Sequence, residues 1–247
     1  MLKSYQKISN LFMTNLGMTL HPIGFIRSEQ KPDNAIPNKN VYDGCIMPLL
    51  FAAAKGQVIA FDSETSGRSC AAFHLGYRNW IFPGIERFLS HGPIPGRSCE
   101  KLVKNAKLAK SYVESIVPEK IRGDVSIFKP LEQFKDEETP EFVIFFVNAD
   151  QISALAALIF FEAPLDSSRI HSQFASACGA CITLPMNFAG KGFKKAVWGL
   201  HDITARAHLP KELMTLTITK PLLHEMGKNM EKSFLFTERW ARIKERT

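Results

Sequence analysis

The stretch SACGACITLP, residues 176–185, contains two of the chain's five cysteines, Cys178 and Cys181, which lie three positions apart among small residues. Thiolates are soft, anionic donors, so a C-x-x-C pair can share a metal ion or an iron–sulfur cluster. At the start of a helix the same pair can act as a redox dithiol. Small residues around two thiols also suit a tightly packed core. The spacing alone leaves all three interpretations open.

Two further cysteines occur in a similar local setting. Cys45 follows DG and Cys70 follows GRS, and a helix is expected to begin next in both cases, as it is after the ASA that precedes Cys178. The free N–H groups and positive potential of a helix N-terminus lower the pKa of a thiol and stabilise anionic sulfur. Three cysteines at three such junctions indicate a shared function for their sulfur atoms.

Besides the cysteines, the sequence offers two candidate ligand-binding residues, Arg206 and His74. Arg206 follows an expected strand, and its planar guanidinium could hold an anionic ligand or form a structural salt bridge with Asp202. His74 lies four positions after Cys70, on the same helix face, so it is a ligand-binding candidate and equally a buried structural histidine. The sequence contains no GxGxxG turn, GxxxxGK[ST] phosphate loop, HExxH or GxSxG motif, which removes the main support for nucleotide-binding, zincin and serine-hydrolase chemistry.

The elements that must position these residues follow from apolar periodicity and turn residues. Residues 141–147 are nearly all apolar, which is typical of a central strand covered on both faces. Helices and strands mix without a regular βαβ rhythm, so we predict an α+β fold, a single domain over residues 1–247, with a mixed sheet and several flanking helices. Helices are expected over 4–16, 45–56, from Cys70, over 83–90, over 98–116 with Ser98 as N-cap, after Asn148 or Asp150, and from Pro221 and Thr237; strands are expected over 21–28, 57–61, 125–130, 141–147, 194–200 and 213–220, with a loop over 29–40.

Composition narrows the class of partner. The net charge is +7 over 247 residues, but the basic residues are spread along the chain without a nucleic-acid-binding motif, so we expect no nucleic-acid partner. No apolar run reaches the roughly 18 residues needed to cross a bilayer, so no membrane partner is expected. An odd number of cysteines, together with an N-terminus unlike a signal peptide, favours a reducing compartment, the cytoplasm.

Several longer stretches resemble one known family, the uncharacterised DUF169 family (COG2043) of bacteria and archaea. They cover about residues 20–235 and imply a single family domain. In the family pattern one cysteine precedes the A-x-x-G helix, a second precedes a hydrophobic–Gly helix, and a third starts the segment that runs into a proline; these correspond to Cys45, Cys70 and Cys178, whereas Cys181 and Cys99 fall outside the pattern. The stretches are DGCIMPLLFAAAKGQVIAFDSETSGRSCAAFHLGY, ERFLSHGPIPG, FKPLEQF, EFVIFFVNADQISALAALIFF, FASACGACITLPM and WGLHDITARAHLPKELMTLTI.

The resemblance supplies no activity, so the functional hypothesis comes from the cysteines. We expect Cys45, Cys70 and Cys178 to bind one iron–sulfur cluster, such as a 4Fe–4S cluster, with Cys181 as the nearest fourth ligand. Such a cluster would serve electron transfer with a redox partner or act as a Lewis acid through an open iron. The alternative is a non-catalytic module in which structural cysteines surround a site for a small anionic ligand near Arg206. A Cys178–Cys181 redox dithiol and a structural zinc site rank behind these two.

Overall fold

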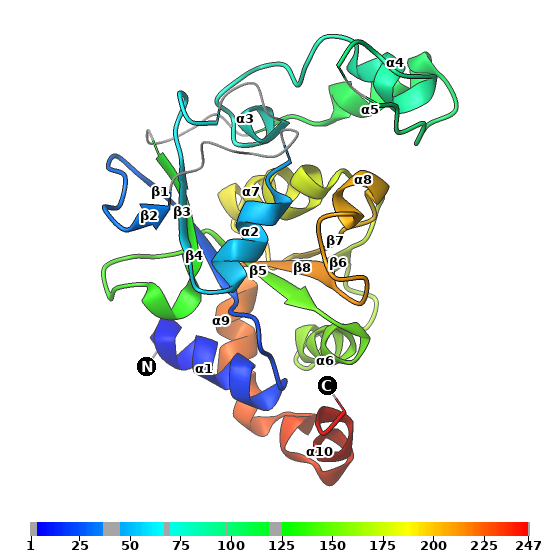
Figure 1. The fold of residues 1–247 in the computed structure, drawn as a ribbon. Helices are drawn as coiled ribbons and strands as arrows, with labels where there is room; N and C mark the ends of the chain where they lie inside the picture. Colours follow the sequence, from blue (N-terminus) through cyan, green and yellow to red (C-terminus); the bar gives the residue numbers. More distant parts are fainter. Residues whose placement is uncertain (1–3, 37–44, 67–69, 97, 119–124, 247) are drawn as a thin grey trace.

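The computed structural model describes residues 4–36, 45–66, 70–96, 98–118 and 125–246. It confirms the predicted α+β class, with one mixed eight-stranded sheet and helices on both sides of it (Figure 1). None of the described helices combines the length and apolar character that a membrane span requires. The helices are α1 (Tyr5–Asn15), α2 (Met47–Ala54), α3 (Cys70–His74), α4 (Ile85–Ser90), α5 (Ala106–Ser115), α6 (Ala149–Ile159), α7 (Leu184–Gly190), α8 (Ile203–Arg206), α9 (Lys220–Asn229) and α10 (Glu238–Lys244). The strands are β1 (Ile23–Ser28), β2 (Ala35–Ile36), β3 (Val58–Phe61), β4 (Val125–Pro130), β5 (Phe142–Val147), β6 (Ile170–His171), β7 (Ala196–Gly199) and β8 (Met214–Thr219).

The strand order across the sheet is β2-β3-β4-β1-β5-β8-β7-β6. The two outermost pairs, β2 with β3 and β6 with β7, are parallel, and the other neighbours are antiparallel. Strand β5 lies in the middle and pairs with β1 on one side and β8 on the other. Strand β4, from the second half of the sequence, therefore lies between β3 and β1, which come from the first half.

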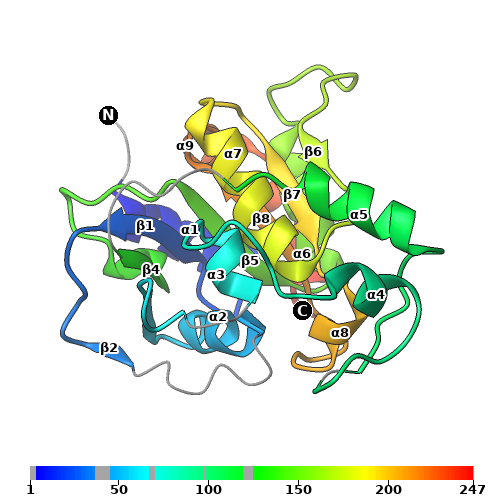
Figure 2. The same ribbon diagram turned by 90° about the horizontal axis from the view of Figure 1, so that it is seen from above.

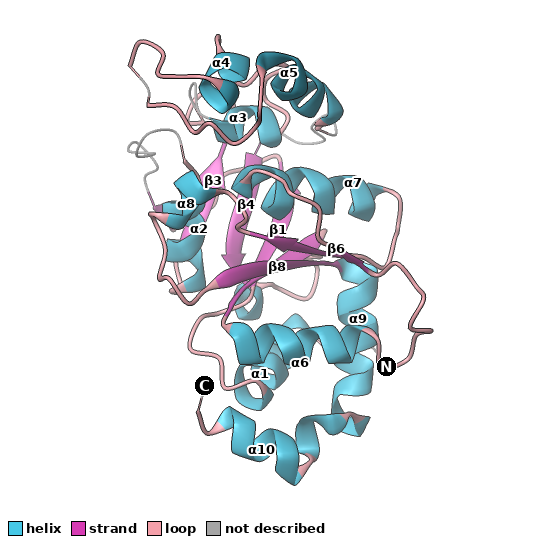
Figure 3. Cartoon of the chain, turned by 90° about the vertical axis from the view of Figure 1, so that its right-hand side faces the viewer, coloured by secondary structure: helices cyan, strands magenta, loops and turns pink. Residues whose placement is uncertain are grey.

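The two faces of the sheet bury two separate cores. Ile144 and Phe146 of β5 face the core beneath α2 and α3, whereas Val143 and Phe145 face the core formed with α1, α6 and α9. This alternation follows from the two-residue period of a strand and explains why every β5 residue is buried. Figures 1 and 3 show α2 and α7 above the sheet, and α1, α6, α9 and α10 below it.

The short helices α4 and α5 lie together at the top of the molecule, beyond α3 (Figure 1). Figure 2, seen from above, shows them over the side of the molecule that carries α8, β7 and β6. The prediction of one helix over residues 98–116 is wrong, because α5 begins only at Ala106, with Asn105 as its N-cap. Lys101 has a φ of 55°, which a right-handed helix cannot accommodate. The segment before Asn105 instead runs back along α4, and the N–H groups of Glu100 and Val103 donate to the carbonyls of Phe88 and Leu89. We call this unit, residues 81–116, the α4–α5 hairpin.

Candidate functional site

A cavity of about 120 Å³ is lined by Cys45, Cys70 and Cys178, which lie 25 and 108 residues apart along the chain. We call it the cysteine pocket. It lies on the same side of the sheet as α2 and α3, and the α4–α5 hairpin supplies its outer side. Its other polar lining residues are His74, Glu100, Tyr112, Ser176, Asp202 and Thr204.

Each of the three cysteines lies at or near the start of a helix. Cys45 precedes α2, and the N–H of Met47 hydrogen-bonds to its sulfur. Cys70 is the first residue of α3. Cys178 lies in the first turn of a helix that continues through a π-helical stretch, Gly179–Thr183, into α7. The fold thus brings three helix starts from distant segments to one pocket.

The side chains of Cys70 and Cys178 are hydrogen-bonded to each other, and this bond dominates their acidity. The hydrogen bond from Cys178 holds the pKa of Cys70 well below its usual value, against the effect of burial, and His74 lowers it further. The same bond and burial raise the pKa of Cys178 well above its usual value. Of the pair, Cys70 is therefore the more acidic cysteine, and Cys178 is the one that donates to it.

The remaining two inner cysteines are neutral thiols. Burial raises the pKa of Cys45 to about 11, with a smaller contribution from the negative charge of Cys70. Burial also raises the pKa of Cys181 to about 11, and its sulfur lies 3.4 Å from the hydroxyl oxygen of Thr215, on the sheet side of the helix. Cys181 does not line the cysteine pocket, although it stands only three residues from Cys178.

His74 is fully buried and joins α3 to the helix that carries Cys178. Its Nδ1 lies 2.7 Å from the hydroxyl of Thr183, and its Nε2 lies 3.5 Å from the hydroxyl of Ser176. His74 also hydrogen-bonds to Cys70, its neighbour one turn earlier on α3. The histidine therefore has two roles, because it fixes α3 in place and stabilises the Cys70 thiolate.

Asp202 is buried and organises the inner end of the pocket. One carboxylate oxygen accepts hydrogen bonds from the N–H groups of Thr204 and Ala205 at 3.0 and 3.3 Å, which caps α8. The other accepts from the N–H of Ala177 at 3.2 Å, at the start of the Cys178 helix. A single side chain therefore fixes two helix starts next to Cys178.

Two residues of the α4–α5 hairpin complete the polar lining. Burial raises the pKa of Glu100 to about 7, although a hydrogen bond from Thr204 opposes this shift. The hydroxyl oxygen of Tyr112 accepts a hydrogen bond from the N–H of Ser176 at 2.6 Å, which links α5 to the segment before Cys178. The sequence contains no motif that singles out Glu100 or Tyr112. Asp202 could have been recognised as an N-cap, since it directly precedes the ITAR turn.

The structure places the other predicted candidate, Arg206, outside the lining of the pocket. Its guanidinium donates to the backbone carbonyls of Lys211 and Leu213, and Nη1 lies 3.7 Å from the sulfur of Met214. It therefore holds the turn between α8 and β8. Cys99 lies away from the pocket, where its sulfur is 3.9 Å from the carbonyl oxygen of His91.

The arrangement offers soft donors, although no single-ion site is already formed. In the described part of the chain, no group of three or more His, Cys, Asp or Glu side chains is arranged to hold one metal ion. Cys45, Cys70 and Cys178 are the residues that could hold a metal centre, with His74 directly beside Cys70. The pKa of Cys70 is lowered and those of Cys45 and Cys178 are raised, and cysteine thiols release their protons when they bind a metal.

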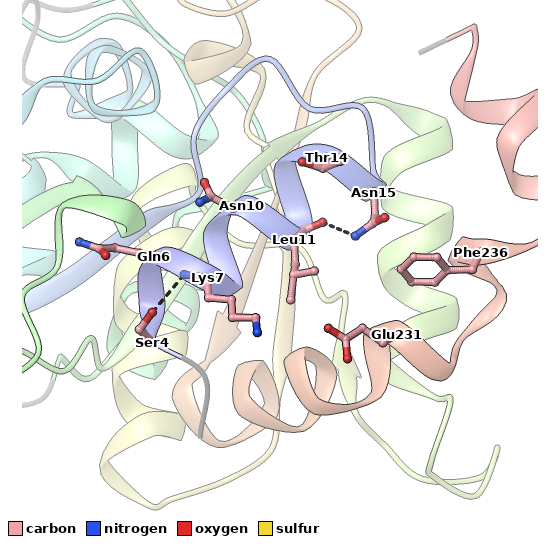
Figure 4. Close-up of a pocket in the computed structure, with 9 residues that line it drawn as sticks. All are labelled: Ser4, Gln6, Lys7, Asn10, Leu11, Thr14, Asn15, Glu231 and Phe236. Atoms are coloured by element: carbon pink, nitrogen blue, oxygen red, sulfur yellow. Dashed lines mark hydrogen bonds between the residues drawn. The ribbon is translucent and has the colours of Figure 1, made fainter. Parts of the chain in front are cut away.

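A second cavity, of about 610 Å³, lies between α1 and the segment before α10 (Figure 4). Figure 4 shows that its two marked hydrogen bonds are local to α1: the N–H of Lys7 donates to Ser4, and the amide of Asn15 donates to the carbonyl of Leu11. None of its described lining residues is a cysteine or a histidine. The chemistry-bearing residues are therefore concentrated in the cysteine pocket.

Comparison with known proteins gives one match. The model of a family described as DUF169, "Uncharacterised ArCR, COG2043", matches residues 12–229. No curated protein and no solved structure matches the chain.

Proposed function

The chain belongs to the DUF169 family, and from this premise we propose that it binds a thiophilic metal centre in the cysteine pocket, an iron–sulfur cluster held by Cys45, Cys70 and Cys178. The observation that carries the proposal is the set of acidic groups that lines the pocket. Three thiols and two carboxyl groups line it, and no Lys or Arg is present among its described lining residues. Buried negative charge is expensive unless a positive partner compensates it, and a metal centre supplies that partner.

The acidity of the thiols supports the same conclusion. Cys70 already favours the thiolate form, which is the form that binds metals. Cys45 and Cys178 have raised pKa values partly because each lies near the negative charge of Cys70. A cation among the three sulfurs would reverse this repulsion and lower all three pKa values together.

The three cysteines have distinct parts in this proposal. Cys70 provides the first anionic donor, and the Met47 N–H helps to stabilise a thiolate at Cys45. Asp202 and His74 hold the helix starts that carry Cys178 and Cys70. A cluster held by three protein thiolates supplies either electron transfer or an open iron that acts as a Lewis acid. Cys181 is not needed as a ligand, since its sulfur lies against Thr215.

Anaerobic purification, followed by iron and sulfide analysis and a visible absorption spectrum, tests the proposal. We expect iron and sulfide in similar amounts, and their loss in Cys45→Ala, Cys70→Ala and Cys178→Ala. Cys99→Ala is the matched control, because Cys99 lies outside the pocket, and it should retain its iron. A wild-type protein that remains free of iron after anaerobic reconstitution contradicts the proposal, and zinc in the same analysis would replace the cluster with a zinc site.

The hydrogen bond between Cys70 and Cys178 favours a second candidate, a dithiol that reduces disulfides. The Cys70 thiolate would attack one sulfur of a substrate disulfide, releasing the other sulfur as a thiolate and forming a mixed disulfide. Cys178 would then lose its proton and attack Cys70, which yields the Cys70–Cys178 disulfide and a fully reduced substrate. Treatment of metal-free protein with oxidised glutathione, followed by peptide mass mapping, should show this disulfide. Recovery of only a stable glutathione adduct on Cys70 would exclude it.

The charge of the pocket argues against a site for an anionic small molecule. An anion entering it would meet the Glu100 and Asp202 carboxyl groups and the sulfur of Cys70, whose pKa is lowered. Arg206 does not offset them, because its guanidinium is bound to backbone carbonyls elsewhere.

A further inference from the structure

The outer side of the cysteine pocket is hydrocarbon, in contrast to its thiol-bearing inner side. We call this side the apolar wall, and it belongs entirely to the α4–α5 hairpin. Phe82 and Phe88 pack edge to face with ring centroids 5.4 Å apart, and neither ring is fully buried. Hydrocarbon side chains are not metal ligands, so this side of the pocket offers contacts of a different kind. The side chains of the apolar wall are Ile81, Phe82, Ile85, Phe88, Leu89 and Ile116.

We propose that the cysteine pocket binds a small organic molecule, neutral or positively charged, whose apolar body of single-ring size lies against the apolar wall. This inference goes beyond the proposed function, because it concerns the opposite side of the pocket and does not require a metal. It rests on the size of the cavity, on the chemistry of the apolar wall, and on the polar groups at its edge.

The size of the cavity limits the ligand. Its volume is about 120 Å³. A dry, apolar protein cavity of roughly 150 Å³ is large enough to bind benzene. The cysteine pocket is partly open, so a molecule slightly larger than one ring can extend beyond the enclosed volume. A nucleotide or a cofactor with several rings is too large for this volume.

The polar groups at the edge of the apolar wall determine the charge of the ligand. Glu100 belongs to the same hairpin and lies near Asp202, so the polar end of a bound molecule meets two carboxyl groups. No described lining residue is a Lys or Arg that could compensate a negative ligand. An amine gains a charge-assisted hydrogen bond here, an alcohol gains an ordinary one, and a carboxylate is repelled.

The attachment of the hairpin is consistent with a cover over a ligand. Tyr112 of the hairpin accepts from the Ser176 N–H at 2.6 Å, and the Asn187 amide donates at 2.9 Å to the carbonyl of Val117, the residue that follows the hairpin. Hydrogen bonds therefore tie the hairpin and its C-terminal end to the segments on either side of Cys178. Within the hairpin, the N–H groups of Glu100, Lys101 and Val103 donate back to carbonyls of α4. The apolar wall therefore has a fixed position relative to the thiols.

Binding of three probes of equal size tests the inference: benzylamine, benzyl alcohol and benzoate, measured by ligand-observed NMR on the full chain. We expect benzylamine and benzyl alcohol to bind, and benzoate to bind at least about tenfold more weakly, a difference of about 1.4 kcal/mol. In Ile85→Trp and in Ile116→Trp the new ring fills the pocket and should weaken binding of both probes about tenfold or more. Leu108→Trp, on the exposed side of α5, is the matched control and should bind like the wild type.

Iron content is measured on the same samples, so the two proposals can fail separately. Probe binding that follows this pattern in a protein that remains free of iron after anaerobic reconstitution supports the inference and overturns the metal centre. Iron bound through the cysteines, with no probe binding at millimolar concentration, overturns the inference alone. Equal affinity for benzoate and benzylamine, or normal probe binding in both folded tryptophan variants, also overturns it.

Discussion

The charge on Cys70 depends on two side chains, one of them more than one hundred residues away in sequence. Cys178 donates the hydrogen bond that lowers the pKa of Cys70, and His74 adds to the effect from the next turn of α3. The helix start alone does not produce a thiolate, since Cys45 lies in a similar place and burial raises its pKa to about 11. Acidity at this site therefore reflects tertiary contacts more than helix geometry.

Removing the donor should make Cys70 less acidic. In Cys178→Ala the thiolate of Cys70 loses its hydrogen bond, so its pKa should rise toward and past the ordinary thiol value. The rate of iodoacetamide alkylation of Cys70, followed across pH by peptide mass spectrometry in metal-free protein, measures this change. Cys181→Ala is the control, and alkylation that keeps the wild-type pH profile in Cys178→Ala would contradict the assignment of donor and thiolate.

Cys181 should affect stability more than metal binding. Its thiol is fully buried beside Thr215, and burial raises its pKa to about 11, so it packs as a neutral group. Cys181→Ala removes one buried sulfur and should lower the free energy of unfolding by about 1–2 kcal/mol. Urea denaturation measures that loss. The iron content should equal that of the wild type, whereas a loss of iron would restore Cys181 as a ligand.

At the scale of elements, the π-helical stretch that follows Cys178 lies very close to strand β7. A Cβ atom on Gly199 would be 2.6 Å from the hydroxyl oxygen of Thr215 and 2.8 Å from the Cβ of Ala180, both too close for normal contact. The glycine is therefore required by packing between the sheet and the helix. This contact sets how closely the helical segment that carries Cys178 and Cys181 approaches the sheet.

Substitution at this contact should be costly. Gly199→Ala must push the π-helical stretch away from β7, with an expected loss of about 1–3 kcal/mol in the free energy of unfolding. Gly92→Ala is the matched control, because its new Cβ would meet no atom within 4 Å. Urea denaturation of both variants gives the comparison. Equal stabilities would show that the helix can shift without strain.

Most helices and strands could be predicted from local sequence patterns. The lining of the cysteine pocket could be predicted only in part. The apolar run of β5 and the capping residue Asn148 indicate a central strand and the start of α6, because both signals are local. The helix expected from Ser98 failed because apolar periodicity cannot reveal that Lys101 adopts a positive φ. Glu100 directly precedes Lys101 in this non-helical segment, so its position in the pocket lining could not be predicted from the sequence. The spacing of Cys178 and Cys181 suggests a shared ligand, but Cys181 contacts Thr215 outside the pocket, and sequence spacing cannot reveal such a contact.

At the scale of the whole molecule, ion pairs connect helix α9, below the sheet, to the edge of the sheet formed by β6 and β7. Glu225 of α9 is paired with Arg169, next to β6, and with Lys194 at 2.6 Å, just before β7. Burial alone would raise the pKa of Glu225, but the hydrogen bonds from Lys194 and Arg169 outweigh it and hold this pKa below its usual value. The helix layer below the sheet is thereby tied to the edge strands.

This pairing should make the protein sensitive to acid. A carboxyl group with a lowered pKa in the folded state stabilises the fold above its unfolded pKa of about 4.3, and that contribution is lost as pH falls through the lower folded value. Glu225→Gln should therefore reduce stability near pH 6 and flatten its decline below pH 4.3. Glu64→Gln, at a carboxyl group outside these ion pairs, serves as the control. Thermal unfolding across this pH range measures both, and parallel curves for Glu225→Gln and the wild type would contradict the prediction.

The strand order also determines when the cysteine pocket can exist during synthesis. The central strand β5 needs β8 as its partner, and the helix that carries Cys178 rests on β7 and β8, so the sheet is incomplete until residue 219 has left the ribosome. Cys45 and Cys70 are synthesised long before that point, when Cys178 is not yet in place beside them. Pairings between such distant segments also form slowly, because a large loop entropy must be lost first. Any metal or ligand in the pocket must therefore bind after residue 219 has been synthesised. Until then the thiols of Cys45 and Cys70 stay reduced only if their surroundings are reducing.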